Sequence, residues 1–179
     1  MTDIETRTAT EVRMNGRKLT GYAAVFGQET RVLDFSETIQ RGAFSKSLAS
    51  GADILALANH DPKQVLARTK SGTLRLSEDN HGLAFEIDVP DTSTGRDLLA
   101  LAARSDLGGM SFGFTVDKDG ESWNGETRTL KSVTLHEVSV VSSFPAYSGT
   151  SVQARARQQR SAAARRIALL EMEAGNVAV

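Results

Sequence analysis

Short segments in which apolar and polar residues alternate recur along this chain, and they limit the folds that it can adopt. The clearest is residues 83–89, LAFEIDV, where every second residue is apolar. A period of two places the apolar side chains on one face of a strand that is buried on one side. Residues 133–143, VTLHEVSVVSS, form the most β-branched stretch and predict a central strand.

Turn residues separate these segments. Asn15-Gly16 lies within residues 8–26 and predicts a hairpin there, and a second hairpin is predicted across residues 72–90. An apolar run at 53–58 predicts a strand that ends just before His60. Residues 27–40 are polar and are predicted to be irregular, and residues 111–133 read as two strands around a glycine-rich turn.

Helical patterns are confined to two regions. Residues 41–50 fit a short helix that ends at Gly51, and residues 91–106 fit a longer one that Thr92 or Thr94 can cap. The sum predicts an α+β fold, with a mostly antiparallel β-barrel or strongly bent sheet surrounded by a few helices.

The composition changes near residue 152. Residues 1–151 are predicted to form one domain, and residues 152–179 form a basic tail rich in alanine and arginine, either helical or disordered. Such a tail is a solvated terminal helix or a segment for docking and packaging. The small, polar stretch SVQARARQQRSAAAR also suits proteolysis.

Composition excludes several classes of function. The net charge is −1, so no overall field attracts nucleic acid or a membrane surface, and no apolar run is long enough to span a bilayer. The polar N-terminus is not a secretory signal, which predicts a cytoplasmic protein or one packaged from a cytoplasm. There is no cysteine, HExxH motif or phosphate-binding loop, so no metal or cofactor is expected.

Residues 109–113, GMSFG, have the G-x-S-x-G spelling of a serine hydrolase nucleophile turn. A nucleophile turn of the α/β-hydrolase kind lies between a strand and a following helix. Here a predicted helix precedes Ser111 and a strand follows it. The hypothesis of an esterase or lipase is therefore supported only by the G-x-S-x-G motif itself. Ser111 remains a candidate nucleophile, and it needs a base to remove its proton.

Only three histidines can supply that base: His60, His81 and His136. His60 lies where a predicted strand meets a polar turn that Asp61-Pro62 is predicted to close. It is either a rigidly placed base or a surface residue capped by Asp61. His81 lies in a tight turn and is expected to be exposed. His136 lies within the predicted central strand.

Glu137 follows His136 on that strand, and neighbouring residues of a strand point to opposite faces. One face is predicted to carry Val133, Leu135, Glu137, Ser139 and Val141, and the other Thr134, His136, Val138, Val140 and Ser142. Only one of His136 and Glu137 is therefore expected to face a given site. A carboxylate in such an apolar strand needs a partner, and an imidazole N–H is suitable. A triad of Ser111, His60 and Glu137 follows, with His136 as the alternative third member.

Taken together, these segments resemble the phage prohead proteases of the HK97 type, which are related in fold to the herpesvirus assemblins. The resemblance covers roughly residues 18–152 and is carried by ANHDP, GGMSFGF and LHEVSVV in this order. It implies a serine endopeptidase on a herpesvirus-protease-like barrel, with His60 as base, Ser111 as nucleophile and Glu137 or His136 as third member. By analogy with assemblins, backbone N–H groups near Ser143, Phe144 and Ala146 form the oxyanion hole.

The resemblance also implies the partners. The substrates are the scaffold segments of the major capsid protein, with the protease's own tail as a further candidate, and a homodimer or higher oligomer is left open. The protein would lie in the host cytoplasm and inside the procapsid, encoded by a phage, a prophage or a gene transfer element. The alternative is a catalytically silent capsid-assembly or scaffolding module.

Overall fold

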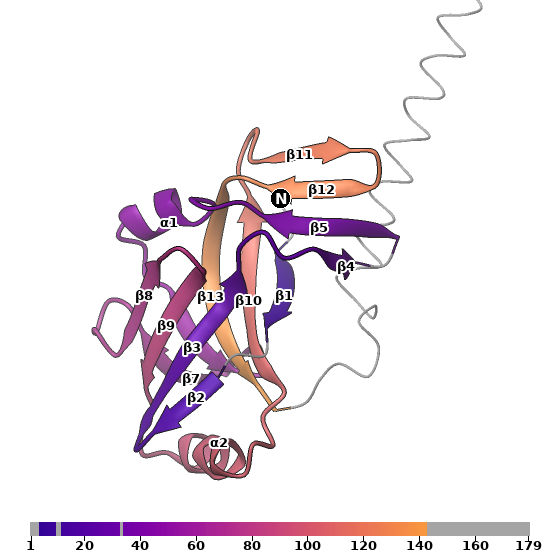
Figure 1. Cartoon of the computed structure of the whole chain (residues 1–179). Helices are drawn as coiled ribbons and strands as arrows, with labels where there is room; N and C mark the ends of the chain where they lie inside the picture. The colour runs from indigo at the N-terminus through magenta and orange to yellow at the C-terminus, as the bar shows by residue number, and fades with distance from the viewer. Residues whose placement is uncertain (1–3, 10–11, 33, 143–179) are drawn as a thin grey trace, which may run out of the picture. The chain divides into compact units, whose positions relative to one another are not determined.

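β-Strands make up most of the described chain (Figure 1). The computed structural model describes residues 4–9, 12–32 and 34–142. The first of three sheets contains the segments that carry the candidate catalytic residues. Its strand order is β1 (Glu5–Ala9), β10 (Gly109–Val116), β13 (Val133–Val141), β6 (Leu55–Ala58) and β7 (Asp61–Arg68). The predicted central strand, β13, is the middle one of these five.

Two four-stranded sheets complete the β structure of the described residues. One has the order β2 (Val12–Asn15), β3 (Lys18–Val25), β9 (Gly82–Asp88) and β8 (Leu74–Glu78). The other has the order β11 (Glu121–Asn124), β12 (Thr127–Leu130), β5 (Phe35–Ile39) and β4 (Thr30–Val32). Both predicted hairpins are present, as β2–β3 and β8–β9.

Neighbouring strands are antiparallel except in the pairs β12–β5 and β13–β6, which are parallel. The prediction of a mostly antiparallel fold is therefore confirmed. In the described part of the chain, hydrogen bonding gives three sheets rather than one continuous barrel.

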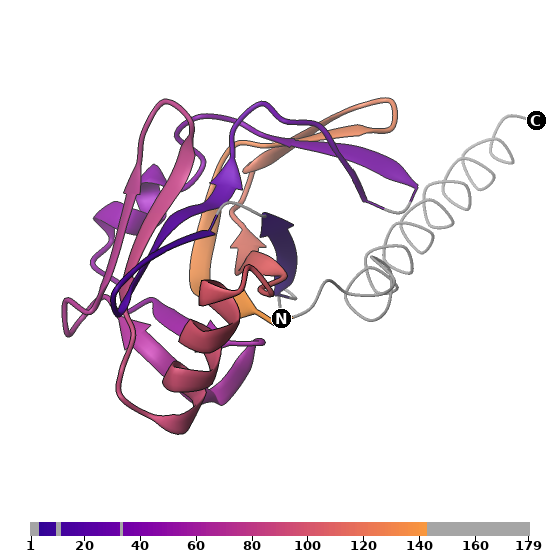
Figure 2. The same ribbon diagram turned by 60° about the horizontal axis from the view of Figure 1, so that its bottom comes forward.

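In the part of the chain that the structure describes, two helices accompany the sheets, α1 (Ser45–Ala49) and α2 (Ser93–Ala103). The predicted cap of α2 is confirmed, because the Thr92 hydroxyl accepts the Gly95 N–H at 3.1 Å. Figure 2 brings α2 to the front. This helix contacts β2, an edge strand of the β2–β3–β9–β8 sheet. No helix of the described residues has the length and apolar character needed to cross a membrane.

The core lies between the five-stranded sheet and the β2–β3–β9–β8 sheet, because β3 contacts β1 and β10 while β9 contacts β7. Alternate residues of β10 supply Met110, Phe112 and Phe114, each at most 1% exposed. The Phe112 ring stacks on that of Phe114 at 5.2 Å and meets the edge of Phe44 at 5.5 Å. Fully burying one such ring contributes about 1.5–3 kcal/mol. This packing fixes which face of β10 is left for the site.

Three regions differ from the sequence prediction. Residues 27–40 are not irregular but contain β4 and β5, in which the buried Phe35 and Ile39 flank the buried charge of Glu37. That charge at a core position concealed the alternation. Residues 61–68 form β7, although Pro62 signals a turn; β7 is an edge strand, where proline is tolerated. Residues 111–133 contribute to four strands, not two, since β11 and β12 intervene between β10 and β13.

Candidate active site

His60 lies in the turn between β6 and β7, in a strained backbone conformation. Asn59 and His60 both have positive φ values, 52° and 60°, which non-glycine residues seldom adopt. The end of β13 holds this turn, because Asn59 N–H donates to the Val140 carbonyl at 2.9 Å and Asn59 Oδ1 accepts the Ser142 N–H at 2.8 Å. Backbone in this region persists only where its surroundings enforce it, and such residues cluster at functional sites.

The His60 imidazole contacts Glu137 directly. Nδ1 of His60 lies 2.7 Å from Oε1 of Glu137, and their side chains are 34% and 13% exposed. A carboxylate accepts only, so Nδ1 carries the proton in this hydrogen bond and the neutral ring keeps a free lone pair on Nε2. Asp61 does not cap His60, because its carboxylate accepts from Lys63 N–H at 2.9 Å and Gln64 Nε2 at 2.8 Å.

A β-bulge in β13 corrects the predicted division of faces. The register between β10 and β13 shifts after Gly113, so that Gly113 pairs with Glu137 while Phe114 pairs with Leu135. His136 is the extra residue of the bulge, and a bulge ends strict alternation. Leu135 and Val138 therefore both point into the core, on the same face of β13. Glu137 points to the opposite face, away from Leu135.

Ser111 lies on the same face of the sheet as Glu137. Its side chain alternates with the core-facing Phe112, and its Cα pairs with Ser139 of β13, which pairs in turn with Leu57 of β6. Ser111 is buried, at 1% exposure. The hydrogen bonds of the described residues do not include one between Ser111 and His60; such contacts are often long before substrate binds.

Gly113 makes room for the acid. A Cβ placed on Gly113 would lie 2.6 Å from Oε1 of Glu137 and 3.2 Å from its Cγ and Cδ, closer than side chains tolerate. The absence of a side chain at Gly113 therefore leaves the space that the Glu137 carboxylate occupies on the neighbouring strand.

The other predicted residues lie elsewhere. His136 Nε2 is 3.0 Å from the Thr115 hydroxyl, which places this imidazole with Thr115 instead of with His60. His81 is exposed in a turn, as predicted, and its N–H donates to Asp79. Ser143, Phe144 and Ala146, predicted to form the oxyanion hole, and the tail from 152 to 179 lie outside the described residues. Across those described ranges, no group of three or more His, Cys, Asp or Glu side chains could hold a metal ion.

Sequence reasoning missed Ser139. Its hydroxyl donates to Glu137 Oε2 at 2.5 Å and accepts the His60 backbone N–H at 3.2 Å. The available signal was its place two residues after Glu137 on the same strand. The hydroxyl connects the acid to the backbone of the histidine.

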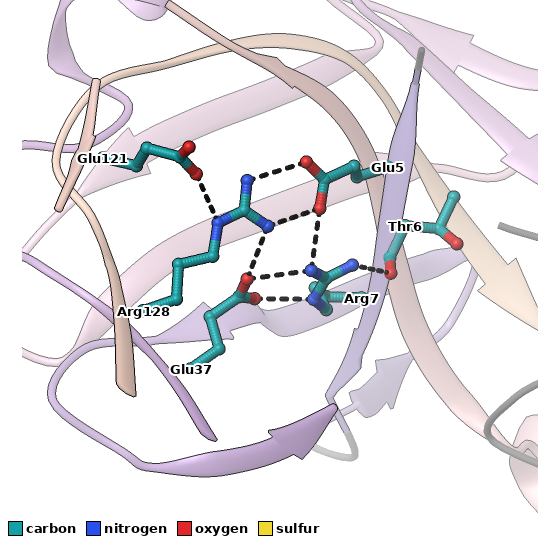
Figure 3. Close-up of polar contacts among 6 residues, drawn as sticks. All are labelled: Glu5, Thr6, Arg7, Glu37, Glu121 and Arg128. Carbon is teal, nitrogen blue, oxygen red and sulfur yellow. Dashed lines mark hydrogen bonds and ion pairs between the residues drawn. The ribbon is translucent and has the colours of Figure 1, made fainter. Parts of the chain in front are cut away.

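A second polar cluster lies between β1 and the β11–β12–β5–β4 sheet (Figure 3). It joins three carboxylates and two guanidinium groups: Glu5, Arg7, Glu37, Glu121 and Arg128. Glu37 is the most buried carboxylate of the cluster, at 2% exposure, and it accepts from Arg7 Nε at 2.6 Å and from Arg128 at 3.0 Å.

The electrostatics of this cluster are those of permanent pairing. Burial raises the pKa of the Glu5 carboxyl, but hydrogen bonds and charge attraction from Arg128 and Arg7 outweigh burial and hold it below its usual value. Burial acts to lower the pKa of Arg128, yet its carboxylate partners raise it further above its already high value. The cluster fastens β1 to a second sheet.

A hydroxyl, an imidazole and a carboxylate are the three side-chain groups that serine hydrolases use, and here all three lie on or beside one face of the five-stranded sheet. The chain belongs to the Caudovirus prohead serine protease family, whose model matches residues 2–165. It is thus a serine protease of phage capsid assembly and maturation, and capsid proteins are the substrates that the family implies.

The fold is similar to that of the bacteriophage T4 capsid assembly protease, gp21. That match has a TM-score of 0.54 at 13% sequence identity and covers 77% of this chain and 95% of the other. No curated protein matches the sequence.

Proposed function

We propose that Ser111, His60 and Glu137 act as nucleophile, general base and orienting acid in peptide-bond hydrolysis. The observation that carries this assignment is the 2.7 Å contact between His60 Nδ1 and Glu137 Oε1. It lies on the sheet face to which the register of β10 and β13 also assigns Ser111. The contact of His136 with Thr115 favours Glu137 over His136 as third member.

In this mechanism His60 Nε2 removes the Ser111 hydroxyl proton as Oγ bonds to the substrate carbonyl carbon. The imidazolium then protonates the amide nitrogen, so that the C–N bond breaks and the amine leaves. The neutral imidazole then takes a proton from water as the water oxygen bonds to the acyl carbon. The imidazolium returns this proton to Ser111 Oγ as the C–Oγ bond breaks and the acid leaves. Glu137 stabilises the imidazolium in both steps, and the backbone N–H groups of Ser143, Phe144 and Ala146 are proposed to bind the oxyanion.

The proposed substrate is the scaffold segment of the major capsid protein, cut inside the assembling procapsid. Family membership supports capsid proteins as the substrate class. The protease's own tail, residues 152–179, is proposed as a second substrate because its composition suits an exposed, cleavable segment. A homodimer or higher oligomer would concentrate the enzyme within the shell.

The test is co-expression of the protease with its capsid protein, followed by mass spectrometry of both chains. Ser111→Ala is expected to leave the capsid protein full length and the tail uncut, while the matched variant Ser122→Ala, on β11, cleaves normally. Ser111→Ala should also abolish labelling by a serine-directed phosphonate. Full cleavage by Ser111→Ala would remove this serine from the mechanism. Capsid binding without cleavage by the wild-type chain would favour the silent assembly module.

A barrel of the herpesvirus-protease kind is proposed as the arrangement of the three sheets. The packing of β3 and β9 against the five-stranded sheet around one core supports it. The test is an experimental structure of the full chain, superposed on a herpesvirus protease. Serine and histidine at different places in the two folds would contradict this relation.

A further inference from the structure

We infer that Ser139 is a positioning residue, which holds His60 and Glu137 in register for proton transfer. The inference rests on the proposed function of that pair. Ser139 lies on β13 between Ser111 on β10 and Leu57 on β6, with which its Cα is paired. It is 0% exposed.

Three hydrogen bonds close a ring through this hydroxyl. The His60 backbone N–H donates to Ser139 Oγ at 3.2 Å, and the Ser139 hydroxyl donates to Glu137 Oε2 at 2.5 Å. Glu137 Oε1 then accepts from His60 Nδ1 at 2.7 Å. The ring therefore begins and ends on the same histidine, once through its backbone and once through its imidazole.

The ring fixes the carboxylate in two ways. A serine hydroxyl has a single proton, and here it is committed to Oε2, so each oxygen of Glu137 has its own donor. A carboxylate held at both oxygens cannot rotate without breaking one of the bonds. Oε1 is thereby kept directed at Nδ1, which fixes the tautomer that leaves Nε2 free for the Ser111 proton.

The ring also fixes the histidine. The φ value of His60 is 60°, a conformation that needs support from its surroundings, and the Ser139 hydroxyl supplies an acceptor for its N–H. Asn59 contributes the rest of this support through its hydrogen bonds to the Val140 carbonyl and the Ser142 N–H. Because Ser139 is fully buried, removal of its hydroxyl leaves the His60 N–H and Glu137 Oε2 each short of this partner, which is costly away from solvent.

Ser139 does not touch the reacting atoms in this scheme, so its effect should fall on the rate of the chemical step. Ser139→Ala is expected to lower kcat about tenfold or more, which corresponds to the loss of one hydrogen bond to a charged group. KM should stay within about twofold, since no substrate contact is removed.

The chain offers a matched control in Ser47. This serine is 6% exposed, and its hydroxyl accepts the N–H of Leu135, on the same strand, at 2.9 Å. Ser47→Ala therefore removes a comparable buried hydrogen bond to β13 outside the ring. It is expected to lower the melting temperature, because it leaves the buried Leu135 N–H without this acceptor, while kcat stays unchanged.

The experiment uses the full chain and a peptide that spans the mapped capsid cleavage site. Values of kcat, KM and melting temperature are measured for Ser139→Ala, Ser139→Thr and Ser47→Ala. Ser139→Thr keeps the hydroxyl and should recover most of the lost kcat. Wild-type kcat in Ser139→Ala, or an equal loss of kcat in Ser47→Ala, would overturn the inference.

A second measurement does not depend on cleavage or on the fate of the threonine variant. In the proton NMR spectrum of chain labelled with ¹⁵N at histidine, the Nδ1–H of His60 should give a strongly downfield signal that Glu137→Gln abolishes. Ser139→Ala should shift or broaden this signal, and Ser47→Ala should not. An unchanged signal in Ser139→Ala would refute the ring.

The two measurements separate this inference from the proposed function. Cleavage by Ser111→Ala with an intact His60 signal that responds to Ser139→Ala would reject the nucleophile and keep the ring. Loss of cleavage in Ser111→Ala with no response to Ser139→Ala would keep the triad and reject the positioning role.

Discussion

Glu37 and Glu137 are both carboxylates withdrawn from solvent, yet their surroundings differ in kind. Glu37 is 2% exposed and is held by the guanidinium groups of Arg7 and Arg128 (Figure 3). Glu137 is 13% exposed and is held by the imidazole of His60 and the hydroxyl of Ser139. One carboxylate has permanent cations as partners, and the other, within the described part of the chain, is hydrogen-bonded to no cation until the imidazole is protonated.

This difference matches the structural role of Glu37 and the catalytic role proposed for Glu137. The charge of Glu37 is balanced in the resting protein, so its interactions contribute to the folded state. The charge of Glu137 gains a full counter-charge only when His60 accepts a proton, and an interaction that strengthens in the transition state accelerates the reaction. Variants of these two carboxylates and of their neighbours distinguish an effect on stability from an effect on cleavage.

The largest expected effect is that of Glu137→Gln on cleavage. Gln keeps the shape but loses the charge and can present an N–H to Nδ1, so kcat should fall about 10³- to 10⁴-fold. The measurement is steady-state cleavage of the capsid-site peptide, with thermal unfolding as a check on folding. His136→Ala should retain kcat within about threefold, because its imidazole contacts Thr115. Similar losses in both variants would contradict the assignment of Glu137.

Glu37→Gln should act on stability. It leaves two buried guanidinium groups short of a counter-charge, which costs about 3–5 kcal/mol of unfolding free energy. Urea denaturation measures this loss, and kcat of the folded fraction should stay near the wild-type value. Glu86→Gln is the control, since Glu86 pairs with Lys18 and Arg75 on an exposed face and should have a much smaller effect. A large fall in kcat for folded Glu37→Gln would contradict a purely structural role for Glu37.

Gly113→Ala tests how closely Glu137 must be held. The added Cβ would lie 2.6 Å from Oε1 and must displace the carboxylate. A displacement on the ångström scale should lower kcat about 10²-fold. Gly120→Ala is the steric control, because its Cβ meets the Ser132 and Asp117 carbonyls, which belong to no part of the site, and it should lose stability rather than kcat. Unchanged kcat in Gly113→Ala would mean that the carboxylate has room to move.

The smallest expected effect is the acid response of the second cluster. The folded pKa of Glu5 lies below its ordinary value of 4.5, so its pairing stabilises the protein above about pH 4.5, and the stabilisation is lost as pH falls through the folded pKa. Denaturation at a series of pH values between 7 and 3 should show stability falling with acid. Glu5→Gln should show a shallower fall in the same window. Parallel curves would exclude Glu5 from the acid response.

Local patterns predicted the parts of the molecule that depend on neighbouring residues. The alternation at 83–89 gave β9, Thr92 capped α2, and the apolar run at 53–58 placed His60 at the end of β6. Each of these depends on residues within a few positions of one another, so periodicity and capping rules apply to it directly.

The missed features depend on residues distant in sequence. The bulge at His136 arises from the register with Gly113 and Phe114 on another strand, and it changed which side chains share a face with Glu137. Glu37 concealed β5 because its cationic partners lie 30 and 91 residues away. The sequence near either segment does not indicate these long-range contacts. They are determined by how strands distant in sequence align and pack in the fold.

The parallel pairing of β13 with β6 has a consequence for the timing of activity. The contact between His60 and Glu137 joins residues 77 positions apart, and the loop between them must close before the pair exists. Contacts of such long range form late in folding and slow it. A chain still leaving the ribosome holds no acid–base pair until β13 has emerged. By this order of synthesis, the pair to which we assign proton transfer forms only when nearly all of the described fold has been made.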